Sequence, residues 1–435
     1  MPEAVIGFSK LSKEEKIEWL ANQYLSGSEK AKSVLKQYWN SDQKLQSLHD
    51  EFIENSISNY YLPYGIAPNF LINGRLLTLP MVIEESSVVA AASNAAKFWL
   101  DKGGFKAEVI ATVKTGQVHL NYSGDPELIR SFFDANKQQL IASISAIEQN
   151  MKKRGGGLLD LELIDSTEKL DAYYQLHATF ETRDAMGANF INSCLEQIAH
   201  SWRQLAANHN GFQDVQPEVV MSILSNYVPD CLVRASVSCP VEQLANNGLS
   251  GEQFADKMVR AVRIAEAEVN RAVTHNKGIM NGVDALVLAT GNDFRAIEAG
   301  VHAFAAKSGR YSSLTHAQIV DGNFEFWIDI PLAMGTVGGL TSLHPLVKLS
   351  MDILGQPSAP ELMQIVAVAG LAQNFAALRS LVTIGIQQGH MKMHLMNILN
   401  QLGANTSEKE AAIEHFKTEA VSFQAASDFI EKSRQ

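Results

Sequence analysis

The amino-acid sequence predicts an α+β fold with more than one domain. Some stretches place apolar side chains at helical spacing behind capping sequences, whereas others alternate apolar and polar residues as strands do. The chain has 435 residues, more than a single hydrophobic core usually supports. Hydrophobic residues make up 46% of it, enough to fill two or three cores.

The first helix is predicted after Ser12. Ser12 and Glu15 have the spacing of a capping box, and Ile17, Leu20 and Tyr24 follow at helical intervals. We expect a short amphipathic helix whose role is packing.

Strands are predicted next. Residues 107–122 contain short β-rich runs, and residues 158–164 alternate again. The sequence shows no internal repeat and no low-complexity linker.

Two long helices are predicted in the second half. Residues 252–270 carry Phe254, Met258, Val262 and Ala265 on one helical face. Ser358 and Glu361 have capping-box spacing, and Pro360 suits a first helical turn. That second helix should continue through Leu362, Ile365, Val366 and Leu371.

Composition limits the possible partners. The formal net charge of −11, without a basic stripe beyond Lys152-Lys153-Arg154, argues against nucleic acid. That short run could meet phosphates of a small ligand. The three cysteines, Cys194, Cys231 and Cys239, are too few for a disulfide framework, so we expect structural thiols in a reducing compartment. No signal core and no uninterrupted membrane span is evident, so we expect a cytoplasmic protein.

The richest motif places a lysine and an aspartate among glycines. It consists of THNKGIMNG (residues 274–282) followed by ATGND (residues 289–293). A lysine there could stabilise an oxygen that becomes negative during a reaction. By residue type alone, the motif is also compatible with a glycine-rich turn and a solvated lysine, and Asp293 with a helix N-cap.

Taken together, several strings resemble those of 3-hydroxy-3-methylglutaryl-CoA reductase, in particular the soluble bacterial-type class of that family. Besides HNKGIMNG and ATGND, they are LPYGIAPNFLINGR (62–75), PMVIEESSVVAAAS (80–93), KRGGG (153–157), RDAMGAN (183–189), ILSNY (223–227), GLAQNFAALR (370–379) and GIQQGHM (385–391). The resemblance covers nearly the whole chain.

The resemblance also implies a domain organisation. It is a large, mostly helical domain in two segments, with a small non-Rossmann α/β cofactor-binding domain inserted between them and a mobile C-terminal helical region. On this chain we place these parts at residues 1–111, 112–217, 218–383 and 384–435, with Gly385 and Gly389 as hinge points.

The reaction implied is the reduction of a thioester to an alcohol with two hydrides from NAD(P)H. Lys277 matches the family's catalytic lysine, and Asp293 matches the aspartate that hydrogen-bonds it. Glu85 matches the catalytic glutamate. In the Glu84-Glu85 pair we expect one residue exposed and the other buried or bonded, and burial would raise its pKa. His390 matches the histidine that protonates the departing coenzyme A thiolate.

Binding residues follow from the same resemblance. Arg271 suits a substrate carboxylate because its fork binds two oxygens. The other substrate contacts align with Ser87, Asn226, Asn281 and Gln373, and the family's proline beside Ser87 is Ser86 here. The nucleotide loop comprises Asp184, Ala185, Met186, Gly187 and Asn189. By pattern alone, Asp184 is also compatible with a helix cap, and the sequence lacks the G-x-G-x-x-G fingerprint of a Rossmann site.

The choice of cofactor depends on opposing charges. Glu148 could bind a ribose 2′-hydroxyl and repel a 2′-phosphate, whereas Lys152, Lys153 and Arg154 could attract that phosphate. We favour NADPH over NADH. His394 lies four residues after His390, but no third ligand accompanies them, so no metal site is predicted.

The resemblance further implies a homodimer, with hydroxymethylglutaryl-CoA as the small-molecule partner. Two alternatives remain open at this point: an acyl-CoA-binding homologue that has lost catalysis, and the same enzyme working in the mevalonate-degrading direction.

Overall fold

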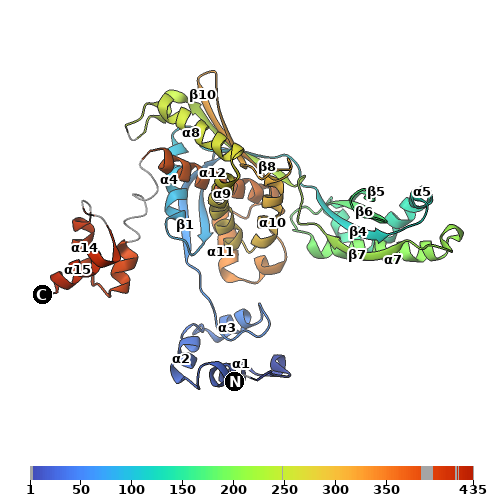
Figure 1. Cartoon of the computed structure of the whole chain (residues 1–435), viewed down its shortest axis with the longest axis horizontal. Helices are drawn as coiled ribbons and strands as arrows, with labels where there is room; N and C mark the ends of the chain where they lie inside the picture. The colour runs from blue at the N-terminus through green and yellow to red at the C-terminus, as the bar shows by residue number, and fades with distance from the viewer. Residues whose placement is uncertain (1–2, 247, 384–394, 417–418, 420, 435) are drawn as a thin grey trace. The chain divides into compact units, whose positions relative to one another are not determined.

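The computed structural model describes residues 3–246, 248–383, 395–416, 419 and 421–434 (Figure 1). Its contacts divide the chain into two compact units, Met1–Pro63 and Tyr64–Gln435. The boundary lies well inside the first domain segment that we expected to extend to residue 111.

The first unit is helical. It contains α1 (Lys13–Tyr24), α2 (Glu29–Gln37) and α3 (Gln43–Asp50). The capping box at the start of α1 is present, since the Ser12 hydroxyl accepts from the Glu15 amide and the Glu15 carboxylate accepts from the Ser12 amide. The predicted first helix is confirmed.

The second unit holds a hairpin and two four-stranded sheets. The hairpin pairs β1 (Tyr64–Ile72) with β2 (Arg75–Val82). The first sheet is antiparallel in the order β3-β8-β10-β9, with bounds Lys106–Val109, Leu232–Pro240, Asn323–Pro331 and Thr315–Val320.

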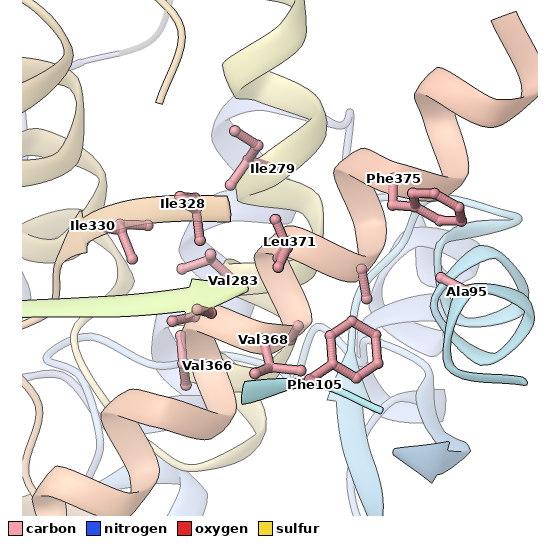
Figure 2. Close-up of a cluster of buried hydrophobic side chains, with 14 of the residues drawn as sticks. Ala95, Phe105, Ile279, Val283, Ile328, Ile330, Val366, Val368, Leu371 and Phe375 are labelled. Atoms are coloured by element: carbon pink, nitrogen blue, oxygen red, sulfur yellow. The ribbon is translucent and has the colours of Figure 1, made fainter. Parts of the chain in front are cut away.

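Six helices accompany this hairpin and sheet. They are α4 (Val88–Leu100), α8 (Gly251–Ala267), α9 (Val269–Ala289), α10 (Phe294–Ala305), α11 (Pro345–Leu354) and α12 (Ala359–Val382). Figure 2 shows their common core, in which Val283 of α9, Leu371 of α12 and Ile328 of β10 gather. The Phe375 ring lies 5.1 Å from that of Trp99, which brings α4 into the same core.

The lysine motif lies inside a helix. The helix predicted at residues 252–270 ends at Ala267, and Glu268 caps α9 by accepting a hydrogen bond from the Arg271 amide. Residues 274–282 are therefore helical, and the glycine-rich turn considered above is wrong. Gly282 permits close packing, because a Cβ there would lie 2.5 Å from the Ala369 carbonyl oxygen of α12.

The second predicted long helix, α12, is confirmed together with its Ser358–Glu361 capping box. Within the described residues, α12 is the one helix long and apolar enough to cross a membrane. Most of its apolar side chains are buried in the core, so its composition is that of a central core helix.

Residues 114–224 form a second sheet with a core of its own, here called the small-sheet segment. Its strand order is β5-β6-β4-β7, all antiparallel. The strands are β4 (Lys114–Asn121), β5 (Gly157–Asp165), β6 (Tyr173–Glu181) and β7 (Glu218–Leu224), and the helices are α5 (Pro126–Ser143), α6 (Ser145–Lys153) and α7 (Ala188–Ala207).

The edges of this segment differ from the expected ones. The strands predicted at residues 107–122 and 158–164 are present. The boundary expected at residue 217 falls before β7, whose pairing with β4 carries the sheet to Leu224. The antiparallel order agrees with the prediction that no Rossmann domain is present.

The C-terminal part contains a small helical cluster. Residues 395–401 are helical, followed by α14 (Thr406–His415) and α15 (Phe423–Ser433). Leu399, Ala412 and Ala426 are buried in its core. The hinge glycines Gly385 and Gly389 lie outside the described residues.

Candidate active site

The turn between β2 and α4 presents Glu85 and Ser87. Ser87 has a left-handed φ of 76° and makes no capping hydrogen bond to α4, an uncommon conformation for a residue with a side chain. Glu84 and Glu85 are both exposed. The bonded member of the pair is Glu85, so the expectation of one exposed and one buried or bonded glutamate is met without burial.

The bonding partner of Glu85 is Lys277. The Lys277 ammonium donates to Glu85 Oε2 at 2.5 Å, with side-chain exposures of 58% and 42%. An ion pair this exposed contributes little to folding. Lys277 stands in the middle of α9, so its backbone is held while its charge stays accessible to a ligand.

Asp293 caps α10 in this structure. Its Oδ1 accepts from the amides of Arg295 and Ala296, at 3.1 and 3.2 Å. The capping alternative is thus observed, and the bonds formed by the described side chains do not include one between Asp293 and Lys277. The neighbouring Asn292 accepts from the Gly335 amide at 2.8 Å.

Arg271 and Asn281 share α9 with Lys277. The Arg271 guanidinium is half-buried, and burial lowers its pKa. No carboxylate pairs with it among the described residues, so it is a partly desolvated cation without a counter-charge. Asn281 lies one helical turn beyond Lys277 and is also half-buried.

Gln373 lies on α12, which packs against α9. It is 6% exposed, and its side-chain oxygen has no hydrogen-bond partner in the described part of the chain. A buried acceptor without a partner costs about 1–3 kcal/mol, so such groups often mark ligand sites.

The loop Thr182–Gly187 leads into α7. Gly187, with φ 94°, is the N-cap residue, the helix has no acidic side chain in its first turn, and no side chain caps it. Asp184 does not cap this helix, so that alternative is wrong. Its Oδ1 instead accepts from the Ala359 amide at the start of α12, at 2.8 Å.

A second segment, residues 335–337, supports this loop. The Thr336 amide donates to the Asp184 carbonyl at 2.8 Å, and Ala185 forms a bridge with Val337. A Cβ at Gly335 would lie 2.5 Å from the Met186 amide nitrogen, so only glycine fits. Because the Gly335 amide also donates to Asn292, it joins the ATGND turn to the loop Thr182–Gly187.

A small pocket lies beside this junction. Lys114, Met186, Asn226, Ile297 and Pro331 are among its lining residues. The structure therefore brings together Met186, predicted for the cofactor, and Asn226, predicted for the substrate.

Glu148 is not placed to contact a ribose. It is fully buried, its Oε1 accepts from the Leu158 amide at 2.6 Å, and Lys152 lies 2.6 Å from its Oε2. This geometry corrects the prediction that Glu148 binds cofactor, because no part of the carboxylate is exposed. Lys152 balances the charge of this carboxylate although its own side chain is 56% exposed, and Lys153 and Arg154 are exposed as well.

Several supporting residues were missed by sequence reasoning. They are Lys114, Thr182, Asn292 and Gly335, and motif spacing gives no signal for the last three. Lys114 had a signal, since it is in phase with the buried Val118 and Leu120 along β4. His390 and His394 lie outside the described residues, among which no group of three metal-ligating side chains occurs.

Comparison with known proteins gives one consistent family. The sequence model described as hydroxymethylglutaryl-coenzyme A reductase matches residues 12–395. A 3-hydroxy-3-methylglutaryl-coenzyme A reductase of Archaeoglobus fulgidus is 37% identical over 95% of this chain and 91% of its own length. A probable reductase of Borreliella burgdorferi is 36% identical over 81% of this chain and 80% of its own. The class II reductase from Streptococcus pneumoniae, bound to NADPH in open conformations, superposes with a TM-score of 0.73 at 37% identity, covering 98% of this chain and all of that one.

Proposed function

The chain belongs to the hydroxymethylglutaryl-coenzyme A reductase family, and from that premise we propose which of its residues carry the reaction. The enzyme reduces 3-hydroxy-3-methylglutaryl-CoA to mevalonate and coenzyme A, with NADPH as the hydride source. The observation that supports the assignment of the site best is the ion pair between Lys277 and Glu85.

Lys277 stabilises the substrate oxygen each time that oxygen becomes negative. The thioester carbonyl and later the aldehyde carbonyl both gain negative charge as hydride arrives at carbon, and an ammonium beside the oxygen lowers that barrier. Glu85 holds the ammonium in place through their 2.5 Å contact and exchanges protons with the substrate oxygens. Asp293, at the start of α10, is the second acidic residue of this site, and the support for its role is the match of the ATGND motif alone.

Arg271 binds the terminal carboxylate of the substrate. Its half-buried guanidinium has no carboxylate partner among the described residues, and a bidentate ligand would supply one. Gln373 offers a buried oxygen for the substrate hydroxyl, and Ser87, Asn226 and Asn281 supply the other polar contacts.

NADPH binds at the loop Asp184–Gly187 and Asn189. The start of α7 fits a pyrophosphate, because its first-turn amides carry the positive end of the helix and no acid or cap occupies it. The exposed Lys153 and Arg154 attract the 2′-phosphate, which favours NADPH over NADH.

His390 protonates the departing thiolate of coenzyme A. The support for this step is the motif GHM alone, together with the need of a thiolate for a proton donor near neutral pH. We also propose that the enzyme is a cytoplasmic homodimer, as the family resemblance implies.

A nicotinamide absorbance assay tests the proposal. The native protein should oxidise two NADPH for each hydroxymethylglutaryl-CoA consumed, and less readily NADH. If the protein binds the acyl-CoA without oxidising either cofactor, it is a binding protein and the proposal is wrong. The reverse assay, with mevalonate, coenzyme A and each oxidised cofactor, compares the degradative direction.

A further inference from the structure

Lys114 is a buried cation to which no role in the reaction has been given. It is the first residue of β4 and is 4% exposed. No carboxylate lies within ion-pair distance of its ammonium in the described ranges of the chain. Burial lowers the pKa of Lys114, partly opposed by the nearby Cys231, Glu181 and Asp184. Lysine side chains are rarely buried without a charged partner, unless the structure or the function of the protein requires the charge at that place.

The ammonium of Lys114 is directed at the nucleotide loop. It donates to the Thr182 hydroxyl at 2.5 Å and to the Ala185 carbonyl at 3.0 Å. The Thr182 hydroxyl in turn donates to the same carbonyl at 2.7 Å, and the Ala185 amide donates to the Thr182 carbonyl at 3.1 Å. The turn Thr182–Ala185 is thus closed from inside, with Lys114 at its centre.

The opposite side of that turn is also fixed. Asp184 binds the start of α12 and residue 336, and Met186 packs on Gly335. Lys114 and Met186 line the same small pocket with Asn226. The lysine therefore acts from the interior of the small-sheet segment on the peptide that leads to the amides of α7.

We propose that Lys114 is a positioning residue for NADPH, holding the Thr182–Gly187 loop so that Met186 and the first turn of α7 face the nucleotide. This inference rests on the proposed function, because it requires that loop to bind NADPH. It extends the binding site to a side chain that supports the cofactor through the Ala185 carbonyl. Each substrate molecule consumes two cofactor molecules. A loop that is already held in its binding conformation therefore lowers the cost of binding twice in each turnover.

The test compares Lys114→Met with Lys137→Met. Both remove a lysine from the small-sheet segment, but Lys137 of α5 forms a partly exposed pair with Asp160 of β5. Equilibrium fluorescence of bound NADPH gives Kd, steady-state assays give KM for each substrate, and thermal unfolding gives Tm. We expect Lys114→Met to raise Kd and KM for NADPH roughly tenfold or more, since two hydrogen bonds from a charged donor are lost.

The other readouts separate positioning from folding. KM for hydroxymethylglutaryl-CoA should stay near the native value in both variants, and Lys137→Met should bind NADPH normally. Unchanged NADPH affinity in Lys114→Met, or an equal loss for both ligands together with a lowered Tm, would overturn the proposal. If Lys114→Met does not fold, Lys114→Gln removes the charge and shortens the side chain while keeping an N–H donor, so Kd for NADPH should rise several-fold, and an unchanged Kd would overturn the proposal. A native protein that binds no NADPH would instead refute the proposed function.

Discussion

Lys277 and Glu85 owe their proximity to two different local structures. The lysine stands in the middle of α9, and the glutamate on a strained turn in which Ser87 is left-handed. Because the pair is exposed, it contributes little to the free energy of unfolding.

Lys277→Ala should abolish turnover while leaving the fold intact. Loss of the charge that faces the developing oxyanion typically lowers the rate on the order of a hundredfold or more. NADPH oxidation measures the rate, and thermal unfolding should show a Tm close to that of the native protein. Lys137→Ala is the matched control. A folded Lys277→Ala protein with near-native kcat would remove Lys277 from the mechanism.

Asp284 is a buried acid with unusual protonation. Burial, followed by the hydrogen bond and charge of Glu298, raises the pKa of Asp284 to about 8, and one of its oxygens has no partner in the described structure. Glu298 in turn lies 2.7 Å from the His302 ring, and this hydrogen bond lowers the pKa of Glu298. The Asp284–Glu298 pair of α9 and α10 therefore retains a proton at neutral pH.

Asp284→Asn should change how stability depends on pH. The folded pKa of Asp284 lies above the unfolded value, so the folded state holds an extra proton and native stability falls as pH rises from about 4 toward 8. The amide is neutral throughout, so Tm of the variant should rise relative to native Tm between pH 5 and pH 8. The lowered pKa of Glu298 acts below this window. A constant Tm difference across the window would show that Asp284 is already ionised.

At this scale the motifs predicted which side chains lie together better than they predicted the surroundings of each. Glu85 and Lys277 do meet, and Glu85 is the bonded member of its pair, but the complete burial of Glu148, which was predicted to bind the ribose of the cofactor, was not foreseen. Solvent exposure depends on which distant segments cover a residue. The Leu158 amide that binds Glu148 could not be inferred from the local pattern.

Helix α9 depends on two glycines with opposite surroundings. Gly282 meets the backbone of α12, whereas a Cβ on Gly278 would have nothing within 4 Å. The two positions therefore form a matched pair for mutation.

Gly282→Ala should destabilise the protein, whereas Gly278→Ala should stabilise it. Alanine improves helix propensity by about 1 kcal/mol at either site. At Gly282 the neighbouring atom is a backbone carbonyl, which cannot move aside as a flexible side chain could. Overpacking of this kind typically lowers the free energy of unfolding by roughly 1–3 kcal/mol. Denaturant unfolding measures both values. Equal effects at the two sites would mean that α9 and α12 pack less closely than the structure indicates.

Helix α6 offers a test of cofactor choice. Lys152 is bound to the buried Glu148, so its removal would leave that carboxylate unpaired, and Lys153 is the cleaner probe. Lys153→Ala should raise KM for NADPH several-fold and leave KM for NADH unchanged, since NADH lacks the 2′-phosphate. Steady-state assays with each cofactor check this. An equal loss for both would place Lys153 away from that phosphate.

Elements were more predictable than their boundaries. Capping boxes at Ser12 and Ser358 located two helices correctly, because a cap is a local contact. The break at Glu268 was missed because helical periodicity continues across it. The pairing of β7 with β4 joins residues about a hundred positions apart and has no local signature.

At the scale of the whole molecule, the main prediction is the homodimer. Leu343, in the segment before α11, and Leu346 and Leu349 within α11 follow one another three residues apart in the sequence and are all exposed. Exposed apolar groups in such a row are common where another surface covers them. Light scattering at assay concentration should give twice the chain mass of 47.7 kDa. Full activity in a monomer would contradict the dimer.

The separation of residues 1–63 was not predicted, because no composition change marks Pro63. The α+β class and the absence of a Rossmann domain were predicted, since both follow from patterns spread along the whole chain. The boundary of a compact unit lies where two segments make few contacts with each other. The amino-acid sequence carries little information about which contacts are absent.

The chain enters the small-sheet segment along β4 and leaves it along β7, and these strands are neighbours with Gly116 opposite Leu224. The two junctions with the rest of the polypeptide therefore lie side by side. A stretch of more than a hundred residues arranged in this way can be gained by a gene in one event, because the recipient has only to open a single loop. The same closeness makes the segment a transplantable module, and exchanging it between relatives offers a route to enzymes with altered nicotinamide preference.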